Sequence, residues 1–197
     1  IGRGHSPEHL CLLNRERALL LAGDQVIPHI TPNVSVLAIE PEGNPLEDFL
    51  ETTQRFLDLP DDVLVLPAHN TPFRGLHRRL QRLIAHHENH FAALEEACVI
   101  PHTALELLPA LFRRPLDTEQ TGLALGECIA HLHTLLARGR IARELDADGL
   151  YRYRTLDVIR GVVEADEVAI ADNQEGRRLD RPHLVLGPTC KVVHHRL

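Results

Sequence analysis

The stretch GHSPEHLCLLNRERALLLAGD, residues 4–24, places two histidines just ahead of two short apolar runs and ends on Gly-Asp. The runs, residues 10–14 and 18–22, are separated by a polar Arg-Glu-Arg segment, and this pattern predicts a β-hairpin whose strands are largely buried. A strand that ends on a carboxylate, next to a loop that carries imidazoles, is a usual way to build a metal site. The same arrangement also occurs in ordinary turns that bind no metal. The other motifs of the chain are needed to choose between these two interpretations.

The next region changes from strand to helix spacing. Apolar residues recur at helical intervals from Pro45, and the sequence Leu-Pro-Asp-Asp at residues 59–62 ends that helix. Residues 63–66 form a continuous apolar strand, and a second helix is predicted over residues 76–97. This order predicts a layered α/β fold, with its chemistry in loops at the carboxyl ends of strands.

The pattern shifts again after Cys98. We expect a short helix over residues 102–112 that Pro109 kinks or ends, and a longer helix over residues 123–138. Residues 140–154 predict two strands around an Asp-Ala-Asp-Gly turn. Helices followed by a β-hairpin are typical of a winged helix, whereas residues 155–197 show no sustained period and are assigned to no domain.

Composition narrows the class of protein. With 44% hydrophobic and 25% charged residues the chain is globular, and its formal charge of −7 argues against a general polyanion binder. No apolar run reaches the length of a membrane span and no signal peptide opens the chain, so we expect no membrane partner.

The cysteines and the first residue of the chain give two further expectations. The four cysteines form no C-x-x-C pair, which argues against a disulfide framework and makes the reducing cytoplasm the default compartment. The sequence holds no methionine and opens on Ile1, so we expect it to begin partway through a longer protein.

The motifs of the first region match a known family in order and spacing. G-H-S-x-x-H, a strand, G-D, a long insert, a second strand and x-x-H together resemble the later motifs of the metallo-β-lactamase fold. By this resemblance His5 is a metal ligand, Asp24 bridges two metal ions and His69 completes the second metal. His9 is expected to orient its neighbours rather than to bind a metal. The implied cofactor is zinc, two ions in a complete site.

The resemblance also implies a fold and a reaction. Residues 1–97 would form the C-terminal half of a metallo-β-lactamase-like domain, a partial αββα sandwich, and residues 98–154 a small α+β winged-helix domain associated with such enzymes. The implied function is a zinc-dependent hydrolase that cleaves a thioester, lactone or similar ester-type bond of a small-molecule substrate through a metal-bound hydroxide.

The sequence departs from the family in two places. The signature H-x-H-x-D-H, which supplies further ligands, is absent, and Asn70 follows His69 where many relatives carry glycine. We therefore expect an N-terminally truncated hydrolase with weak or absent metal binding and negligible activity alone. An uncovered apolar face would favour homo-oligomers.

Two other interpretations stay open. The winged helix could bind nucleic acid, or the enzyme could be a metal-dependent nuclease. Against nucleic-acid binding, seven arginines and seven acids balance between residues 98 and 154. The segment HHENH at residues 86–90 is not H-E-x-x-H, so we expect its histidines to be solvated or to pack.

Overall fold

The structure is a computed structural model that describes residues 1–156. Its elements in chain order are β1 (Leu12–Asn14), β2 (Leu19–Gly23), α1 (Pro45–Phe56), β3 (Leu64–Pro67), α2 (Leu76–Ala97), α3 (Leu108–Leu111), α4 (Thr118–Ala137), β4 (Ile141–Leu145) and β5 (Tyr151–Thr155). This is the mixed α/β fold that the sequence predicted. Apart from its first two residues, the segment 155–197 lies outside the described residues.

The three-stranded sheet has the order β1-β2-β3. β1 and β2 form the expected antiparallel hairpin, but the prediction that its strands are largely buried is wrong for β1, an edge strand with no buried residue. β2 and β3 are parallel, with Gly23 opposite Pro67. Because the carboxyl ends of parallel strands meet at one edge of a sheet, the loops that follow β2 and β3 leave the sheet side by side. This pairing, which the sequence did not predict, brings Asp24 next to the segment that carries His69.

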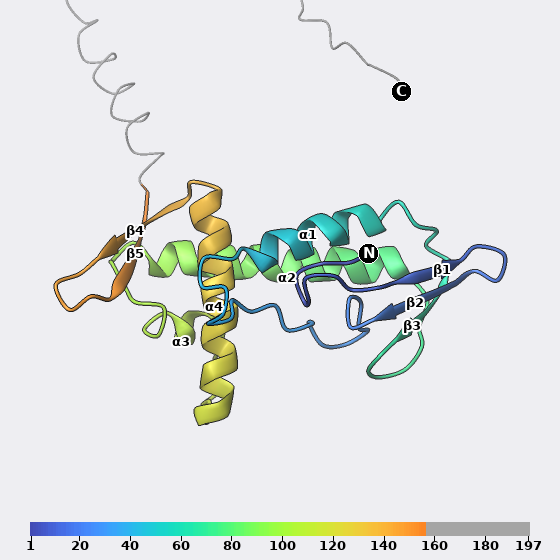
Figure 1. Cartoon of the computed structure of the whole chain (residues 1–197), viewed down its shortest axis with the longest axis horizontal. Helices are drawn as coiled ribbons and strands as arrows, with labels where there is room; N and C mark the ends of the chain where they lie inside the picture. Colours follow the sequence, from blue (N-terminus) through green and yellow to red (C-terminus); the bar gives the residue numbers. More distant parts are fainter. Residues whose placement is uncertain (157–197) are drawn as a thin grey trace, which may run out of the picture. The chain divides into compact units, whose positions relative to one another are not determined.

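α1 and α2 pack along one another beside this sheet (Figure 1). Both helices were predicted, and α2 has the predicted bounds. Their apolar stripes are fully buried and form much of the core: Leu46, Phe49, Leu76, Leu80, Leu83, Phe91 and Leu94. Glu47 and Asp48 lie in the first turn of α1, where the helix dipole favours acidic side chains.

The region after Cys98 departs from the sequence prediction at two helix starts. α3 begins at Leu108 with Pro109 in its first turn, so the prediction of a helix over 102–112 broken by Pro109 is wrong; proline fits a first turn, which needs no amide hydrogen. α4 begins at Thr118 rather than 123, because the Asp117 side chain accepts a hydrogen bond from the amide of Gln120 and caps the helix.

α4 crosses α1 and α2, and the β4-β5 hairpin lies against the C-terminal end of α2 (Figure 1). Arg138 at the end of α4 forms ion pairs with Glu47 of α1 and Glu88 of α2, and Thr134 donates to the Asn44 side chain. One continuous core runs beneath all of these helices. The predicted helix and hairpin elements are present, while the boundary between 97 and 98 and the winged-helix assignment stay predictions.

The outer face of the hairpin β1-β2 is apolar. Leu12 and Leu21 are cross-strand partners and both are about half exposed, while the neighbouring Leu10 is largely exposed. Apolar side chains gathered on a strand at the edge of a sheet favour association with another surface. Homo-oligomer formation through this face stays a prediction.

No helix within residues 1–156 combines the length and the apolar character that crossing a bilayer requires.

Candidate metal centre

Asp24 lies between two imidazoles at the sheet edge where β2 and β3 end. Its Oδ2 is 3.8 Å from Nε2 of His5, and its Oδ1 is 3.4 Å from Nε2 of His69. His5 comes from the N-terminal loop, Asp24 directly follows β2, and His69 lies two residues past β3. The structure thus brings together the three residues that the sequence selected as metal ligands. Their binding of a metal stays a prediction.

The hydrogen bond of His5 fixes which of its nitrogens faces Asp24. His5 Nδ1 lies 2.8 Å from the backbone carbonyl of Asn33, and because a carbonyl only accepts, Nδ1 carries the hydrogen. In the neutral ring, Nε2 then presents a lone pair toward the Asp24 carboxylate. His5 Nε2 and the Asp24 carboxylate are then two acceptors that face each other, and a cation bound between them would interact favourably with both.

The carboxylate of Asp24 has an oxygen without a donor. Oδ1 is buried and has no hydrogen-bond partner, since the 3.4 Å approach of His69 Nε2 lacks hydrogen-bond geometry. A buried carboxylate oxygen without a donor is costly in a protein that holds only protein atoms. Two imidazole nitrogens and this carboxylate are the ligand types that zinc prefers, so the residues present fit the metal that the resemblance implies.

His9 has a different place from His5. Its Nε2 accepts a hydrogen bond of 3.1 Å from the backbone amide of Asp24, and its Nδ1 lies 3.4 Å from the Ser6 hydroxyl. With both nitrogens engaged, His9 holds the backbone that carries Asp24 instead of offering a free lone pair. This contact fits the orienting role predicted for it.

One contact of the centre escaped the sequence analysis, and Asn70, which that analysis named, has a structural explanation. The carbonyl of Asn33 lies 28 residues from His5, and no local signal joins the two. Asn70 has a φ of 68°, in the left-handed region that glycine and asparagine adopt most easily. Asparagine therefore suits the left-handed conformation that the loop has at this position.

A Gly23→Ala substitution should disturb the centre without touching a predicted ligand. Gly23 has a φ of 54°, and an added Cβ would lie 2.3 Å from His9 Nε2. Because His9 then has to move away from the Asp24 amide, we expect zinc affinity to fall about tenfold or more. Gly139→Ala is the matched control, since its φ is 65° and nothing lies within 4 Å of the new Cβ.

Both variants carry a similar left-handed strain of about 1 to 2 kcal/mol, and only Gly23→Ala adds the clash with His9, so its loss of thermal stability should be the larger of the two. Competition between the protein and a chromophoric chelator measures the zinc affinity of each. Equal affinities in the two variants would show that His9 does not position Asp24.

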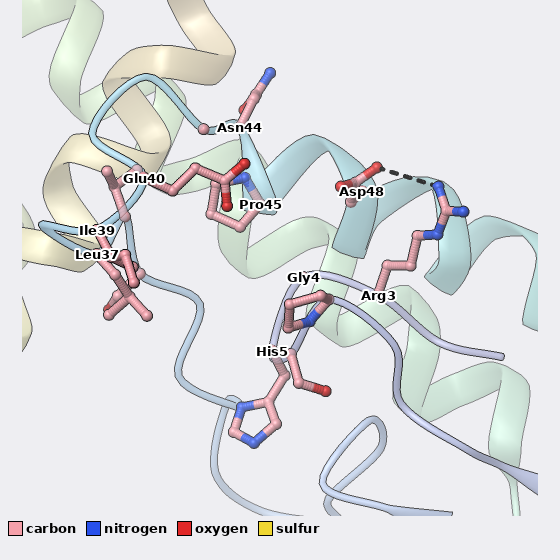
Figure 2. Close-up of a pocket in the computed structure, with 14 residues that line it drawn as sticks. Arg3, Gly4, His5, Leu37, Ile39, Glu40, Asn44, Pro45 and Asp48 are labelled. Carbon is pink, nitrogen blue, oxygen red and sulfur yellow. Dashed lines mark ion pairs between the residues drawn. The ribbon is translucent and has the colours of Figure 1, made fainter.

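A pocket of about 340 Å³ opens beside His5. Figure 2 shows its labelled lining on three segments: Arg3, Gly4 and His5 of the N-terminal loop, Leu37, Ile39 and Glu40 of the loop before α1, and Asn44, Pro45 and Asp48 at the start of α1. Leu37 and Ile39 are largely exposed apolar side chains. A pocket of this size with mixed polar and apolar walls is typical of small-molecule sites.

Comparisons with known proteins show what this chain is similar to. Residues 91–156 match the family described as metallo-beta-lactamase-like, C-terminal domain. The chain is 43% identical to a beta-lactamase domain protein from Burkholderia ambifaria, with a TM-score of 0.77, over 79% of this chain and 46% of that one. It is 33% identical to a metallo-beta-lactamase family protein from Thermus thermophilus, with a TM-score of 0.67, over 78% of this chain and 47% of that one. A search of curated proteins gives no match.

These similarities support membership of the metallo-β-lactamase superfamily, a class whose members are usually metal-dependent hydrolases. The chain spans less than half the length of either related structure.

Proposed function

We propose that this chain forms part of a zinc-dependent hydrolase that cleaves a thioester, lactone or similar ester-type bond. The observation that carries the proposal is the meeting of His5 Nε2 and His69 Nε2 on the two oxygens of Asp24. The similarity to metallo-β-lactamase-family structures supports the same reaction class. His5, Asp24 and His69 would hold zinc, which would supply a nucleophilic water near neutral pH and a positive charge for the carbonyl oxygen.

The protein's own residues would set the geometry of this reaction. Asn33 holds the His5 ring by its Nδ1–H, so that Nε2 is the atom available to the metal. His9 fixes the backbone of Asp24, and thereby the direction of its carboxylate. The His69 side chain is 67% exposed, so this ligand faces the solvent side of the proposed centre.

The adjacent pocket is the proposed place for the rest of the substrate. Leu37 and Ile39 offer apolar contacts, and the Arg3 guanidinium lies 4.0 Å from the Asp48 carboxylate at the other wall. Such walls suit an ester with an apolar acyl or ring portion and a polar remainder.

The ligands that the family draws from H-x-H-x-D-H have no counterpart in the printed sequence. We propose that they lie outside it, so the test uses the longest natural form of the protein that contains this sequence. That form, loaded with zinc, should hydrolyse a thioester or lactone, and a strong chelator should abolish turnover that zinc then restores. The 197-residue chain assayed beside it should turn over far more slowly.

The same assay separates the alternatives. A phosphodiester and plasmid DNA serve as substrates for the nuclease interpretation, and a duplex-binding titration at low salt serves for nucleic-acid binding. Zinc-dependent turnover of phosphodiesters without turnover of any ester would replace the proposed reaction. Absence of zinc-dependent turnover on every substrate would reject the hydrolase altogether.

A further inference from the structure

A second group of metal-ligating side chains lies where α2 and α4 cross. His86 and His90 lie one turn apart on α2, and Glu127 faces them from α4. One ligand atom from each of the three residues lies within 4.8 Å of the others. The two imidazole rings are 4.1 Å apart between centroids.

We propose that His86, His90 and Glu127 form a second zinc site that clamps α2 to α4. Two imidazoles at i and i+4 on one helix face, with a carboxylate from a facing helix, are three of the four ligands of a tetrahedral zinc ion, and water supplies the fourth. Ligand atoms around such an ion lie about 3.4 Å apart. The three side chains therefore need only small torsional changes to close on it.

One ring nitrogen of His90 lacks a hydrogen-bond partner, as expected of a metal ligand whose metal is absent. Its Nδ1 is buried and without a hydrogen bond. A buried polar atom without a partner costs stability unless something binds it.

Two neighbouring histidines are already paired, which leaves His86 and His90 for the metal. His131 Nδ1 lies 2.8 Å from the Glu127 carbonyl and must donate to it, so its Nε2 accepts from His87 Nδ1 at 3.0 Å. The first of these bonds also fixes the backbone that carries the Glu127 carboxylate. His131 and His87 thus support the site from behind, as the partners of metal ligands commonly do.

The sequence could not show this site. HHENH lacks the glutamate position of H-E-x-x-H, and the acidic ligand comes from a helix 37 residues further along the chain. The expectation that these histidines are solvated or pack is the competing interpretation in the test.

The experiment uses the full 197-residue chain with an Asp24→Asn substitution, which weakens the first centre. After dialysis against zinc and then buffer at about pH 7.5, metal analysis should give about one zinc per chain, and zinc should raise the melting temperature by several degrees. Cobalt in place of zinc should give the visible absorption of a tetrahedral site.

Adding His90→Gln or Glu127→Gln to that background should lower zinc affinity at least about tenfold and remove the zinc-dependent rise in melting temperature. Adding His29→Gln, at an exposed histidine outside the cluster, should change neither. Circular dichroism in chelator checks that each variant is folded, and Glu127→Gln keeps the side-chain shape should His90→Gln fail to fold. Failure of Asp24→Asn to retain zinc, or equal retention by all variants, would overturn the proposal. Neither outcome depends on hydrolase activity, so the proposed function is tested separately.

Discussion

Asp24→Asn in the longest natural form of the protein should reduce kcat/KM for its ester substrate by about a thousandfold or more, a loss of about 4 kcal/mol in transition-state stabilisation. Asparagine keeps the shape of the side chain and the backbone amide that donates to His9. It removes the negative charge that faces His5 and His69, and with it the ligand proposed to hold two cations together.

The same substitution should act in the opposite direction on the metal-free protein. Asp24 Oδ1 is a buried acceptor without a donor, so removing its charge should raise the free energy of unfolding in chelator by about 1 kcal/mol. A functional group that costs stability while its ligand is absent is the expected trade-off at a binding site.

Steady-state kinetics, zinc content and urea unfolding in chelator check the three parts of this prediction, and His29→Gln is the control. Retention of both zinc content and turnover by Asp24→Asn would remove Asp24 from the centre and the proposed reaction with it.

Local patterns in the sequence predicted most of the elements. The hairpin β1-β2, the strand β3 and the helices α1 and α2 each follow an apolar period that their own residues carry. The start of α4 was missed because its apolar stripe begins later than its cap, although Asp117 followed by Gln120 is a capping signal. Pro109 was interpreted as a helix breaker because the predicted helix began at residue 102. In the structure the helix begins at Leu108, so Pro109 lies in its first turn.

Parts of the structure that depend on distant residues could not be predicted in this way. The parallel pairing of β2 with β3 joins segments more than 40 residues apart, and it is this pairing that brings Asp24 and His69 together. The family resemblance, rather than periodicity, selected those two residues. The cluster of His86, His90 and Glu127 had no such resemblance behind it and became visible only once α4 was seen to cross α2.

Loss of stability in acid is the second large effect that the structure predicts for the metal-free protein. Burial lowers the pKa of His87 to about 2, that of His131 to about 3 and that of His90 to about 4. In the unfolded chain these groups titrate near about 6.5. As the pH falls below that value the unfolded state takes up protons that the folded state does not bind, so the free energy of unfolding decreases.

Glu127 works against this trend. Its folded pKa of about 7 lies above its unfolded value, so it contributes stability that is fully present below the unfolded pKa and is lost as the pH rises toward 7. Between about pH 6.5 and 4.5 the unfolded chain binds three histidine protons that the folded chain does not, and the folded chain binds one carboxyl proton that the unfolded chain does not. The unfolded state therefore binds a net excess of about two protons. Each proton is worth about 1.4 kcal/mol per pH unit, so the net slope is about 3 kcal/mol per unit.

Over the two pH units between about 6.5 and 4.5 this slope removes about 6 kcal/mol, so a metal-free chain at the lower end of the usual stability range of about 5 to 15 kcal/mol should unfold near about pH 4.5 to 5. Urea titrations in chelator at several pH values between about 7.5 and 4.5 measure this dependence of stability on pH.

His87→Leu should reduce the slope by the contribution of about one proton. It removes a buried imidazole that packs against Phe49 and whose Nε2 has no partner. His29→Gln, which removes an exposed imidazole, should leave the slope unchanged. A free energy of unfolding that stays constant across this acidic range would contradict the prediction. It would mean that the buried histidines take up protons within the folded protein. The packed interface between α2 and α4 would then have to open to water while the rest of the fold persists.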